Sequence, residues 1–491
     1  MCKPDNFPPG PIRLPLWGSY LFCLLENFNF PQVTLLRWAK KYGSIYSMYL
    51  GYIPIIIVCD NESCKEVFTR TEFDGRPDLY AARFRSVGFQ KLGISFTDGP
   101  QWHEQRRFAL RHLRDYGFGR RFEKLETLMA EQIQSVIDFI KYAKYSPKDS
   151  DIIRTDGCVL LPDILYPIMM NSVMSTFGVE PALPDTDRYR SFRKIGRGAL
   201  DLLQGVHPTG IINLLPWLRY VLPEITGYNK LAASNNALIP FFKSVIEEIK
   251  QTRVDDEEVR NFYDRYNDTI RVNENDENST FSDDQLLMLT IDFAFPTLAV
   301  TTTTVVQLIY SLLHHPECQD KLLQEIDEVV GRGRLPILDD RQNMPYTESV
   351  IREVLRKETL LPLGIPHRVT EDTTLRGYTI PKNTFVYTLL EGAHMDEKVW
   401  GDPENFRPER FITEAGTLVK TDFSMPFGAG KRLCAGETFA RNALFLIVTA
   451  LYQNFIFKVP VGAKLPSLKN KIPGISNTPK DLCWVHAVVR D

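Results

Sequence analysis

One ten-residue segment, 427–436, limits the possible folds and functions of this chain more than any other segment does. It reads Phe-Gly-Ala-Gly-Lys-Arg-Leu-Cys-Ala-Gly. Its cysteine, Cys434, is framed by glycines, which permit tight turns and close approach of the backbone to a ligand. Backbone N–H groups in such a loop can point at the sulfur and stabilise it as a thiolate. Arg432 can reach a carboxylate on the rim of a ligand, and Phe427 can shield one side of the sulfur. The segment therefore predicts a cysteine that ligates the metal of a flat, acidic-rimmed ligand.

Haem matches this description best, because an axial thiolate pushes electron density onto iron and favours cleavage of an O–O bond. A buried structural cysteine in a glycine-rich turn is the alternative. The segment resembles the haem-binding signature of the cytochrome P450 family, with phenylalanine, glycine, arginine, cysteine and a closing glycine in the family's order. The resemblance covers nearly the whole chain. It implies that Cys434 ligates the iron of haem b, and that Phe427, Arg432 and Gly436 contact the haem.

The remaining pattern predicts one large domain, 1–491, that is mainly α with small β-sheets. Hydrophobic residues make up 44% of the chain, and no Gly/Ser-rich or Pro-rich linker divides it. Apolar residues at helical spacing predict helices at about 33–42, 61–68, 101–112, 120–144, 160–178, 186–204, 227–252, 282–313, 316–330, 344–359 and 435–453. β-Branched and aromatic runs predict two strands within 45–58, and one each near 375–379 and 384–389.

Helix boundaries and one loop can also be predicted. Asn61 is expected to cap the helix that follows the first two strands. The polar, acidic segment 253–281 is expected to be a solvated loop. Ser282 and Gln285 have the spacing of a capping box for the long helix after it.

The N-terminal segment predicts attachment to a membrane surface without a membrane-spanning helix. The longest early apolar run, 14–25, contains a proline and is too short to cross a bilayer. A proline-rich hinge at 7–11 is similar to the one that follows the anchor of microsomal P450s. Only six residues precede it, so the N-terminal membrane anchor is expected to be absent from this sequence. Apolar surface near the start and middle of the chain could still hold the protein on the cytosolic face of the endoplasmic reticulum membrane.

Cysteine spacing and net charge argue against several other classes of protein. The eight cysteines include no C-x-x-C pair and fit neither a zinc site nor a dense disulfide framework, so reduced thiols are expected. A formal net charge of −3 gives no indication of nucleic-acid binding.

Two further motifs are similar to haem-binding motifs of the family. Trp102 and Arg106 are four residues apart on a predicted helix and share a face, so an indole N–H and a guanidinium could together hold a haem propionate. His367, in the segment Gly-Ile-Pro-His-Arg, resembles another propionate-binding position of the family. The alternatives are a core tryptophan with an exposed arginine, and a surface histidine.

The resemblance also implies a buried ionic network. Glu353 and Arg356 lie one helical turn apart, and exposed pairs of this kind contribute little to stability. In the family the same pair is buried and joined by the arginine of a Pro-Glu-Arg-Phe segment, which is present here with Arg410. Glu353, Arg356 and Arg410 are therefore expected to form a structural network on the cysteine side of the haem.

The long central helix departs from the family pattern. The family has an acid followed by a threonine there, which relay protons, whereas ungapped counting places Ala299 and Val300 at those positions. Pro296 is expected to kink the helix, which could open an oxygen-binding groove and turn Thr301 inward. Thr301 is our candidate catalytic residue, with Thr297 as a second source of the hydroxyl. A threonine-rich helix without a relay is the alternative.

The implied activity is that of a monooxygenase, which inserts one oxygen atom from O₂ into a small apolar substrate such as a hormone, lipid or xenobiotic. Electrons would come from NADPH through a flavoprotein, NADPH–cytochrome P450 reductase, with cytochrome b5 as a second donor. A basic surface could dock this partner; its residues would be Arg107, Arg111, Arg114, Arg120, Arg121, Lys124, Lys431 and Arg441. Residues 96–108 and 115–121 are particularly similar to insect members of the animal group that includes drug- and steroid-oxidising enzymes.

The resemblance places the substrate pocket between five segments, 80–96, 195–225, 293–301, 361–365 and 475–476. Two other functions stay open at this stage. One is a haem-thiolate isomerase or dehydratase that acts on a peroxide, which the missing acid and alcohol motivate. The other is a non-catalytic haem- or lipid-binding protein.

Overall fold

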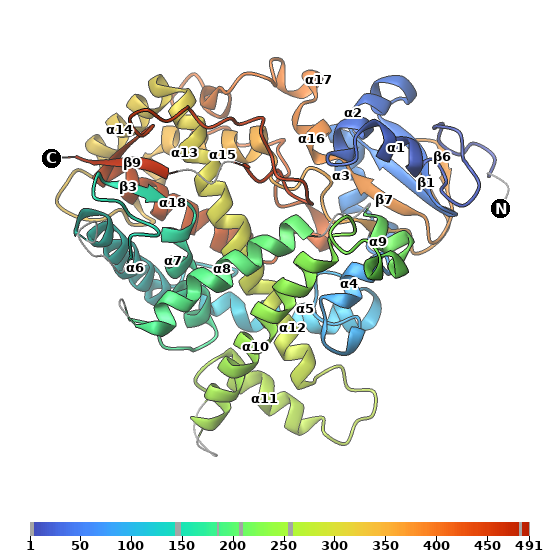
Figure 1. Ribbon diagram of the computed structural model, residues 1–491, viewed down its shortest axis with the longest axis horizontal. Helices are drawn as coiled ribbons and strands as arrows, with labels where there is room; N and C mark the ends of the chain where they lie inside the picture. Colours follow the sequence, from blue (N-terminus) through green and yellow to red (C-terminus); the bar gives the residue numbers. More distant parts are fainter. Residues whose placement is uncertain are drawn as a thin grey trace.

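A computed structural model describes residues 4–142, 149–183, 186–205, 210–253, 259–480 and 484–490. It is mainly helical with small β-sheets, which confirms the predicted fold class (Figure 1). The α-helices of the described residues are α1 (Tyr20–Glu26), α2 (Pro31–Tyr42), α3 (Asn61–Thr69), α4 (Tyr80–Phe84), α5 (Gly99–Leu113), α6 (Glu123–Tyr142), α7 (Tyr166–Thr176), α8 (Asp187–Gly205), α9 (Ile211–Leu214), α10 (Tyr228–Gln251), α11 (Phe262–Val272), α12 (Asp283–Pro296), α13 (Thr302–His314), α14 (Pro316–Val329), α15 (Pro345–Glu358), α16 (Leu390–His394), α17 (Glu397–Trp400) and α18 (Glu437–Asn454).

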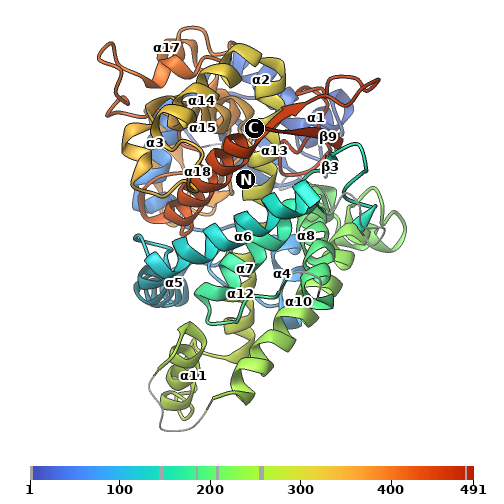
Figure 2. The same ribbon diagram turned by 90° about the vertical axis from the view of Figure 1, so that its left-hand side faces the viewer.

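One continuous helical run crosses the middle of the molecule (Figure 1, Figure 2). It consists of α12, a π-helical segment at Thr297–Thr301 and α13. By length and composition the run 283–314 could cross a membrane, but 78% of its most apolar window is buried inside the fold. Helices that are apolar on all sides are typical of protein cores. The helices α7, α8 and α18 pack against the π-helical segment, and α15 packs against α13.

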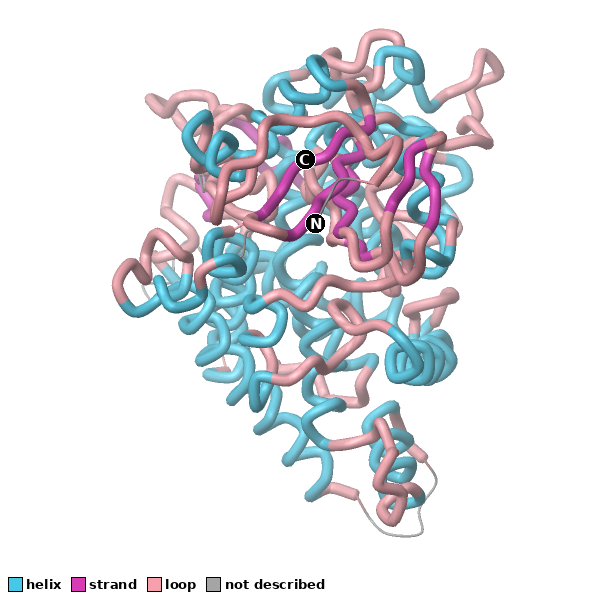
Figure 3. Tube along the Cα trace, turned by 90° about the vertical axis from the view of Figure 1, so that its right-hand side faces the viewer, coloured by secondary structure: helices cyan, strands magenta, loops and turns pink. Residues whose placement is uncertain are grey.

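The strands form three small sheets, drawn in magenta in Figure 3. Their bounds are β1 (Ile45–Leu50), β2 (Ile53–Val58), β3 (Cys158–Leu160), β4 (His367–Arg368), β5 (Thr373–Leu375), β6 (Tyr378–Ile380), β7 (Phe385–Thr388), β8 (Phe455–Lys458) and β9 (Trp484–Val489). The largest sheet has the order β1-β2-β7-β4, with β1 and β2 antiparallel and β7 parallel to β2; the others are β3-β9-β8 and β5-β6. The strands predicted within 45–58 and at 384–389 are confirmed. The strand predicted at 375–379 is instead a hairpin that turns at Gly377, whose φ of +85° favours glycine.

The proline-rich segment 7–11 lies along β1. The backbone N–H of Ser47 donates to the Pro9 carbonyl at 2.7 Å, and the Ser47 hydroxyl donates to the Pro8 carbonyl at 2.8 Å. A Cβ at Gly10 would lie 1.8 Å from the Ser47 carbonyl oxygen, so only glycine allows this approach. The segment is therefore fixed to the edge of the largest sheet.

The segment 253–281, predicted to be a loop, contains α11, so that prediction was wrong for the helical residues. Residues 254–258 of this segment lie outside the described residues. The helix forms because three aromatic side chains, Phe262, Tyr263 and Tyr266, are fully buried against the core. The prediction of a loop followed from the acidic composition of the segment and did not take account of this apolar helix face.

Two capping predictions need correction. Asp60, not Asn61, accepts the capping hydrogen bond of α3. Ser282 does accept the backbone N–H of Gln285 at 3.2 Å, but the Gln285 side chain accepts the backbone N–H of Gly93 at 2.9 Å instead of closing the capping box. The helix predicted over 160–178 begins only at Tyr166, after β3, and residues 143–144 of the helix predicted over 120–144 lie outside the described residues. The other predicted helices are present, with ends shifted by at most three residues.

Candidate active site

A cavity of about 320 Å³ lies between the central helix, the segment after α15 and the loop that carries Cys434. Each of the five segments expected to line a substrate pocket contributes to its wall, through residues such as Ala82, Leu202, Phe293, Leu361 and Ile475. These side chains are apolar, so the cavity suits an apolar ligand.

Cys434 faces this cavity, whereas the other cysteines of the described residues are buried free thiols. Its backbone N–H donates to the Phe427 carbonyl at 2.9 Å, which closes the loop. Gly430 has a φ of +64°, and a Cβ there would lie 2.0 Å from the Phe68 carbonyl oxygen of α3. Only glycine therefore lets the loop pack against α3. Phe427 and Gly436 also line the cavity.

The electrostatics of the sulfur are set by reduced hydration and by the loop backbone. The protein that encloses the cavity reduces hydration of the Cys434 sulfur, which raises the pKa of the thiol; the Gly436 N–H lowers this pKa, the Glu437 carboxylate raises it, and the Arg106 charge lowers it. Coordination to a metal cation deprotonates a thiol outright. The Gly436 N–H and Arg106 are thus the groups in this chain that favour the thiolate.

Trp102 and Arg106, both on α5, lie beside the cysteine loop. Arg106 donates to the Leu433 carbonyl, and the Arg432 guanidinium lies 3.5 Å from the centroid of the Trp102 ring. The Nε1 atom of Trp102 and the Nη1 atom of Arg432 are buried without a hydrogen-bond partner in the described part of the chain. Such atoms are rare and costly, so they indicate that an acceptor group enters the cavity here.

His367 in β4 and Arg76 line the same part of the cavity. His367 Nδ1 lies 2.7 Å from the Phe73 carbonyl, and burial together with the Arg76 charge holds the pKa of the imidazole well below its usual range. Arg76 donates to the Pro366 carbonyl at 2.9 Å. Sequence reasoning missed Arg76. Its only local signal is the following Pro77, which favours an extended backbone at this point.

The charges at this rim of the cavity fit haem. Arg76, Arg106 and Arg432 donate to backbone carbonyls, and among the described residues none of them forms an ion pair. Burial, with the neighbouring arginines adding to it, lowers the pKa of Arg432 to about 8 and that of Arg76 to about 10. A cluster of unpaired cations beside a free thiol suits a ligand that has a metal at its centre and carboxylates at its edge. The Cys434 sulfur would hold the iron, and the rim side chains would hold the propionates.

Glu353, Arg356 and Arg410 come together in the structure. Glu353 and Arg356 are fully buried and 2.8 Å apart, and Arg410 lies 3.1 Å from Glu353. Arg356 also donates to the His394 carbonyl at 2.8 Å, and the His394 ring accepts the Met425 backbone N–H at 3.0 Å. The network therefore connects α15 to the segment that leads into the cysteine loop.

The central helix widens where a kink was expected. Pro296 lacks an N–H, and the five residues after it, Thr297–Thr301, are π-helical. Val300 and Thr301 line the cavity, whereas Ala299 is fully buried. The expected acid position therefore carries an apolar side chain in the core.

Thr301 differs from its threonine neighbours in its hydrogen bonding. Thr297, Thr302, Thr303 and Thr304 each donate a hydroxyl to the carbonyl four residues back. The Thr301 hydroxyl has no partner within the described ranges of the chain, and it faces the cavity. It is thus the hydroxyl of this run that is available to another group.

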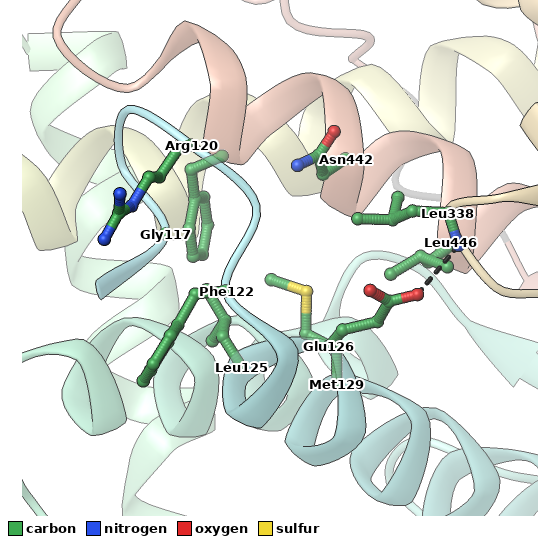
Figure 4. A pocket seen from close by; sticks show the side chains of 10 residues that line it. Gly117, Arg120, Phe122, Leu125, Glu126, Met129, Leu338, Asn442 and Leu446 are labelled. Carbon is green, nitrogen blue, oxygen red and sulfur yellow. Dashed lines mark hydrogen bonds between the residues drawn. The ribbon is translucent and has the colours of Figure 1, made fainter. Parts of the chain in front are cut away.

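A second hollow lies away from the sulfur, between α6, α18 and the turn at Gly117 (Figure 4). Glu126 crosses it and accepts the Leu338 backbone N–H at 2.8 Å. Its volume of about 10 Å³ is the space of a single water at most. The hollow is therefore a packing gap, and the chemistry belongs to the larger cavity.

A helical domain that presents a cysteine to a buried apolar cavity, beside unpaired cations, has the features of a haem-thiolate protein. Comparison with known proteins identifies the family of haem-thiolate proteins to which the chain belongs. The model of the cytochrome P450 family matches residues 8–484, and the chain belongs to this family. It is therefore a P450 monooxygenase that uses haem with a thiolate ligand.

The relatives include an insect enzyme and mammalian P450s. Farnesoate epoxidase of Bombyx mori is 33% identical over 96% of this chain and 92% of its own length. Cytochrome P450 2J3 of Rattus norvegicus is 34% identical over 94% of this chain and 88% of its own length. Cytochrome P450 2J2 of Homo sapiens is 32% identical over 99% of this chain and 92% of its own length. The similarity to insect and other animal P450s that the sequence indicated is confirmed.

Proposed function

We propose that this protein inserts one oxygen atom from O₂ into a small apolar substrate, with electrons delivered from NADPH by NADPH–cytochrome P450 reductase. The observation that supports this best is that Cys434 and the free Thr301 hydroxyl face the same apolar cavity. Haem bound to Cys434 supplies the reductive activation of O₂, and the thiolate favours O–O cleavage.

The chain itself performs three tasks in this proposal. The apolar wall binds the substrate and excludes water from the reacting groups. Trp102, Arg432 and the neighbouring rim cations fix the orientation of the haem through its propionates. Thr301 Oγ1 holds a proton that it can donate toward O₂ and recover from water, which is a general-acid role.

Basic residues near the cysteine loop support docking of an acidic electron donor. Arg107, Arg111 and Lys124 are exposed, and the described residues provide no ion pair for them. The other candidates are each close to a carboxylate, namely Arg114, Arg120, Arg121, Lys431 and Arg441. We infer that the three unpaired side chains contribute most to binding of the reductase, or of cytochrome b5.

Exposed apolar side chains support attachment to the cytosolic face of the endoplasmic reticulum membrane. Trp217 is 56% exposed, Tyr220 is 75% exposed, and Leu16 is 89% exposed. Leu214 packs into the same apolar cluster as α1 and β1 and approaches Gly51. Figure 1 shows α9 beside this end of the sheet. The segment around Leu16 and the segment 217–220 therefore lie on the same side of the molecule. A protein bound to a membrane surface requires its exposed apolar side chains to share one side.

The second candidate function is that of an isomerase or dehydratase that rearranges a peroxide. It is motivated by Ala299 and Val300, which occupy the positions where the family usually has an acid and a threonine. The two candidates differ in their source of oxygen. With haem-loaded protein, reductase, NADPH and isotope-labelled O₂, we expect apolar compounds from a screening panel to gain one labelled oxygen atom, as measured by mass spectrometry. Turnover of a hydroperoxide without NADPH, together with no NADPH consumption, would contradict the monooxygenase and support the isomerase.

A further inference from the structure

A buried ion pair lies in the cavity wall, next to the rim cation Arg76: Arg76 donates to the Ser95 carbonyl at 3.2 Å, and the Ser95 backbone N–H donates to Asp292 of the pair. Arg85, directly after α4, and Asp292 on α12 are 7% and 3% exposed, with Nη1 and Oδ1 2.7 Å apart. Both residues line the cavity. Arg85 shares no partner with Arg76, Arg106 or Arg432; its guanidinium instead lies 5.0 Å from the centroid of Phe96. Charged groups are unusual in an apolar binding wall and are expensive to bury there.

The Asp292 carboxylate accepts hydrogen bonds from backbone N–H groups as well as from Arg85. Its Oδ2 atom accepts the backbone N–H of Ile94 at 2.6 Å and that of Ser95 at 3.0 Å. Gly93 has a φ of +80°, and a Cβ there would lie 2.2 Å from Asp292. Backbone N–H groups stabilise a carboxylate without any cation, so Asp292 does not require the whole charge of Arg85.

Arg85 has donors to spare. A guanidinium has five N–H groups, and the structure uses one for Asp292 and one for the Leu92 carbonyl at 3.3 Å. The Nε atom is buried, and the described ranges contain no acceptor for it. A buried donor without an acceptor costs stability, and a carboxylate that turns the guanidinium toward the cavity would relieve this cost.

The position of Arg85 sets the length of a matching ligand. Its partner Asp292 lies nine residues before Thr301 on one continuous helix, which corresponds to about 13 Å along the axis. A ligand that reaches from Arg85 to the reacting end of the cavity must therefore be long, with an apolar body and one anionic end.

We propose that Arg85 binds the carboxylate of a long-chain apolar acid in the cavity. Asp292 keeps its hydrogen bonds from the Ile94 and Ser95 N–H groups when this ligand binds Arg85. This proposal rests on the proposed monooxygenase function and narrows its substrate class. A relative, farnesoate epoxidase of Bombyx mori, is named for an apolar carboxylate, which is consistent with this chemistry. The acid group would orient the chain so that its far end approaches Thr301 and the haem.

The experiment measures binding rather than turnover. Farnesoic acid and methyl farnesoate, and myristic acid and methyl myristate, are titrated into haem-loaded protein by equilibrium dialysis at neutral pH. For at least one pair we expect the acid to bind the wild type at least about tenfold more tightly than its ester. Arg85→Gln should weaken binding of that acid by about tenfold or more while changing ester binding much less, because only the acid loses a charge-assisted hydrogen bond.

The controls separate recognition from structure. Arg83→Gln changes another arginine of the same segment, which pairs with Asp78 at the surface, and should leave both affinities unchanged. Arg85→Gln combined with Asp292→Asn removes both charges; acid binding should stay weak. Recovery of acid binding in this double variant would show that Arg85 serves only Asp292, and equal affinity of acid and ester for the wild type in both pairs would also overturn the proposal. Oxidation of an ester with NADPH and reductase reports separately on the monooxygenase function, so the two claims can fail independently.

Discussion

At the scale of single residues, proton delivery depends on Thr301. Its hydroxyl faces the cavity and has no partner among the described residues, unlike those of the adjacent threonines. Thr301→Ala should lower the product formed per NADPH oxidised by about tenfold, since a lost proton donor diverts reduced oxygen to hydrogen peroxide. Parallel assays of NADPH oxidation, product and peroxide measure this coupling.

Two variants control for structural damage. Thr302→Ala removes a neighbouring buried hydroxyl that is tied to the Leu298 carbonyl, and coupling should not change. Thr301→Ser keeps the hydroxyl and should retain most of the coupling. Normal coupling in Thr301→Ala would mean that protons arrive by another route, such as Thr297 or water.

Residues of the candidate site differ in how far their roles can be predicted from sequence. Cys434 and Arg432 lie in one short loop, and Trp102 and Arg106 share one helix face, so local patterns suffice to single them out. Arg76 instead bonds to the carbonyl of a residue 290 positions away. No local spacing encodes such a contact, and therefore only the fold shows that Arg76 belongs to the cationic rim.

At the scale of elements, α16 makes the fold sensitive to acid through His394. Burial, with the charge of Arg356 adding to it, lowers the pKa of His394 from 6.5 to about 3. Between these values the unfolded chain binds a proton that the folded chain excludes, so stability is highest above pH 6.5 and falls as the pH decreases. Between pH 6.5 and pH 5, exclusion of this proton should lower the free energy of unfolding by about 2 kcal/mol.

Chemical denaturation of the haem-loaded protein at pH 7 and at pH 5 measures this loss. His394→Gln should reduce the difference in unfolding free energy between the two pH values by about 2 kcal/mol. An equally steep pH dependence in His394→Gln would refute the role of this histidine.

Elements with one strong apolar face were predicted well, and those defined by their neighbours were not. The amphipathic α14 and α15 appear close to their expected bounds. In α11, the acidic composition outweighed three aromatic residues whose burial depends on distant helices. Pro296 indicated a disturbed helix, but whether the helix kinks or widens depends on packing by α7, α8 and α18, which local sequence does not specify.

At the scale of the whole molecule, the network centred on Glu353 joins parts of the chain that lie far apart in sequence. Glu353 is fully buried and binds Arg356, Arg410 and the Arg407 backbone N–H at 2.8–3.1 Å. Glu353→Gln should lower the free energy of unfolding by about 3–5 kcal/mol, because it leaves the fully buried Arg356 without a counter-charge among the described residues, whereas Arg410 keeps Asp402 at 3.2 Å. Denaturant titration at pH 7 measures this loss.

A surface ion pair between Lys357 of the same helix, α15, and Glu404 in the segment after α17 provides the comparison. Lys357 lies 3.1 Å from Glu404, whose side chain is 84% exposed. Glu404→Gln should cost less than about 1 kcal/mol, since exposed ion pairs contribute little. Equal losses in the two variants would show that burial of the Glu353 network does not determine its contribution.

The central claim is that the Cys434 sulfur binds haem iron. The most direct measurement is the absorbance spectrum of the haem-loaded protein after reduction and addition of carbon monoxide, for the wild type and for Cys434→His. We predict a strongly red-shifted main band in the wild type, as a thiolate ligand produces, and its loss in Cys434→His, in which nitrogen replaces sulfur. A wild-type spectrum without that shift, or a shift that persists in Cys434→His, would contradict the assignment of Cys434 as the iron ligand.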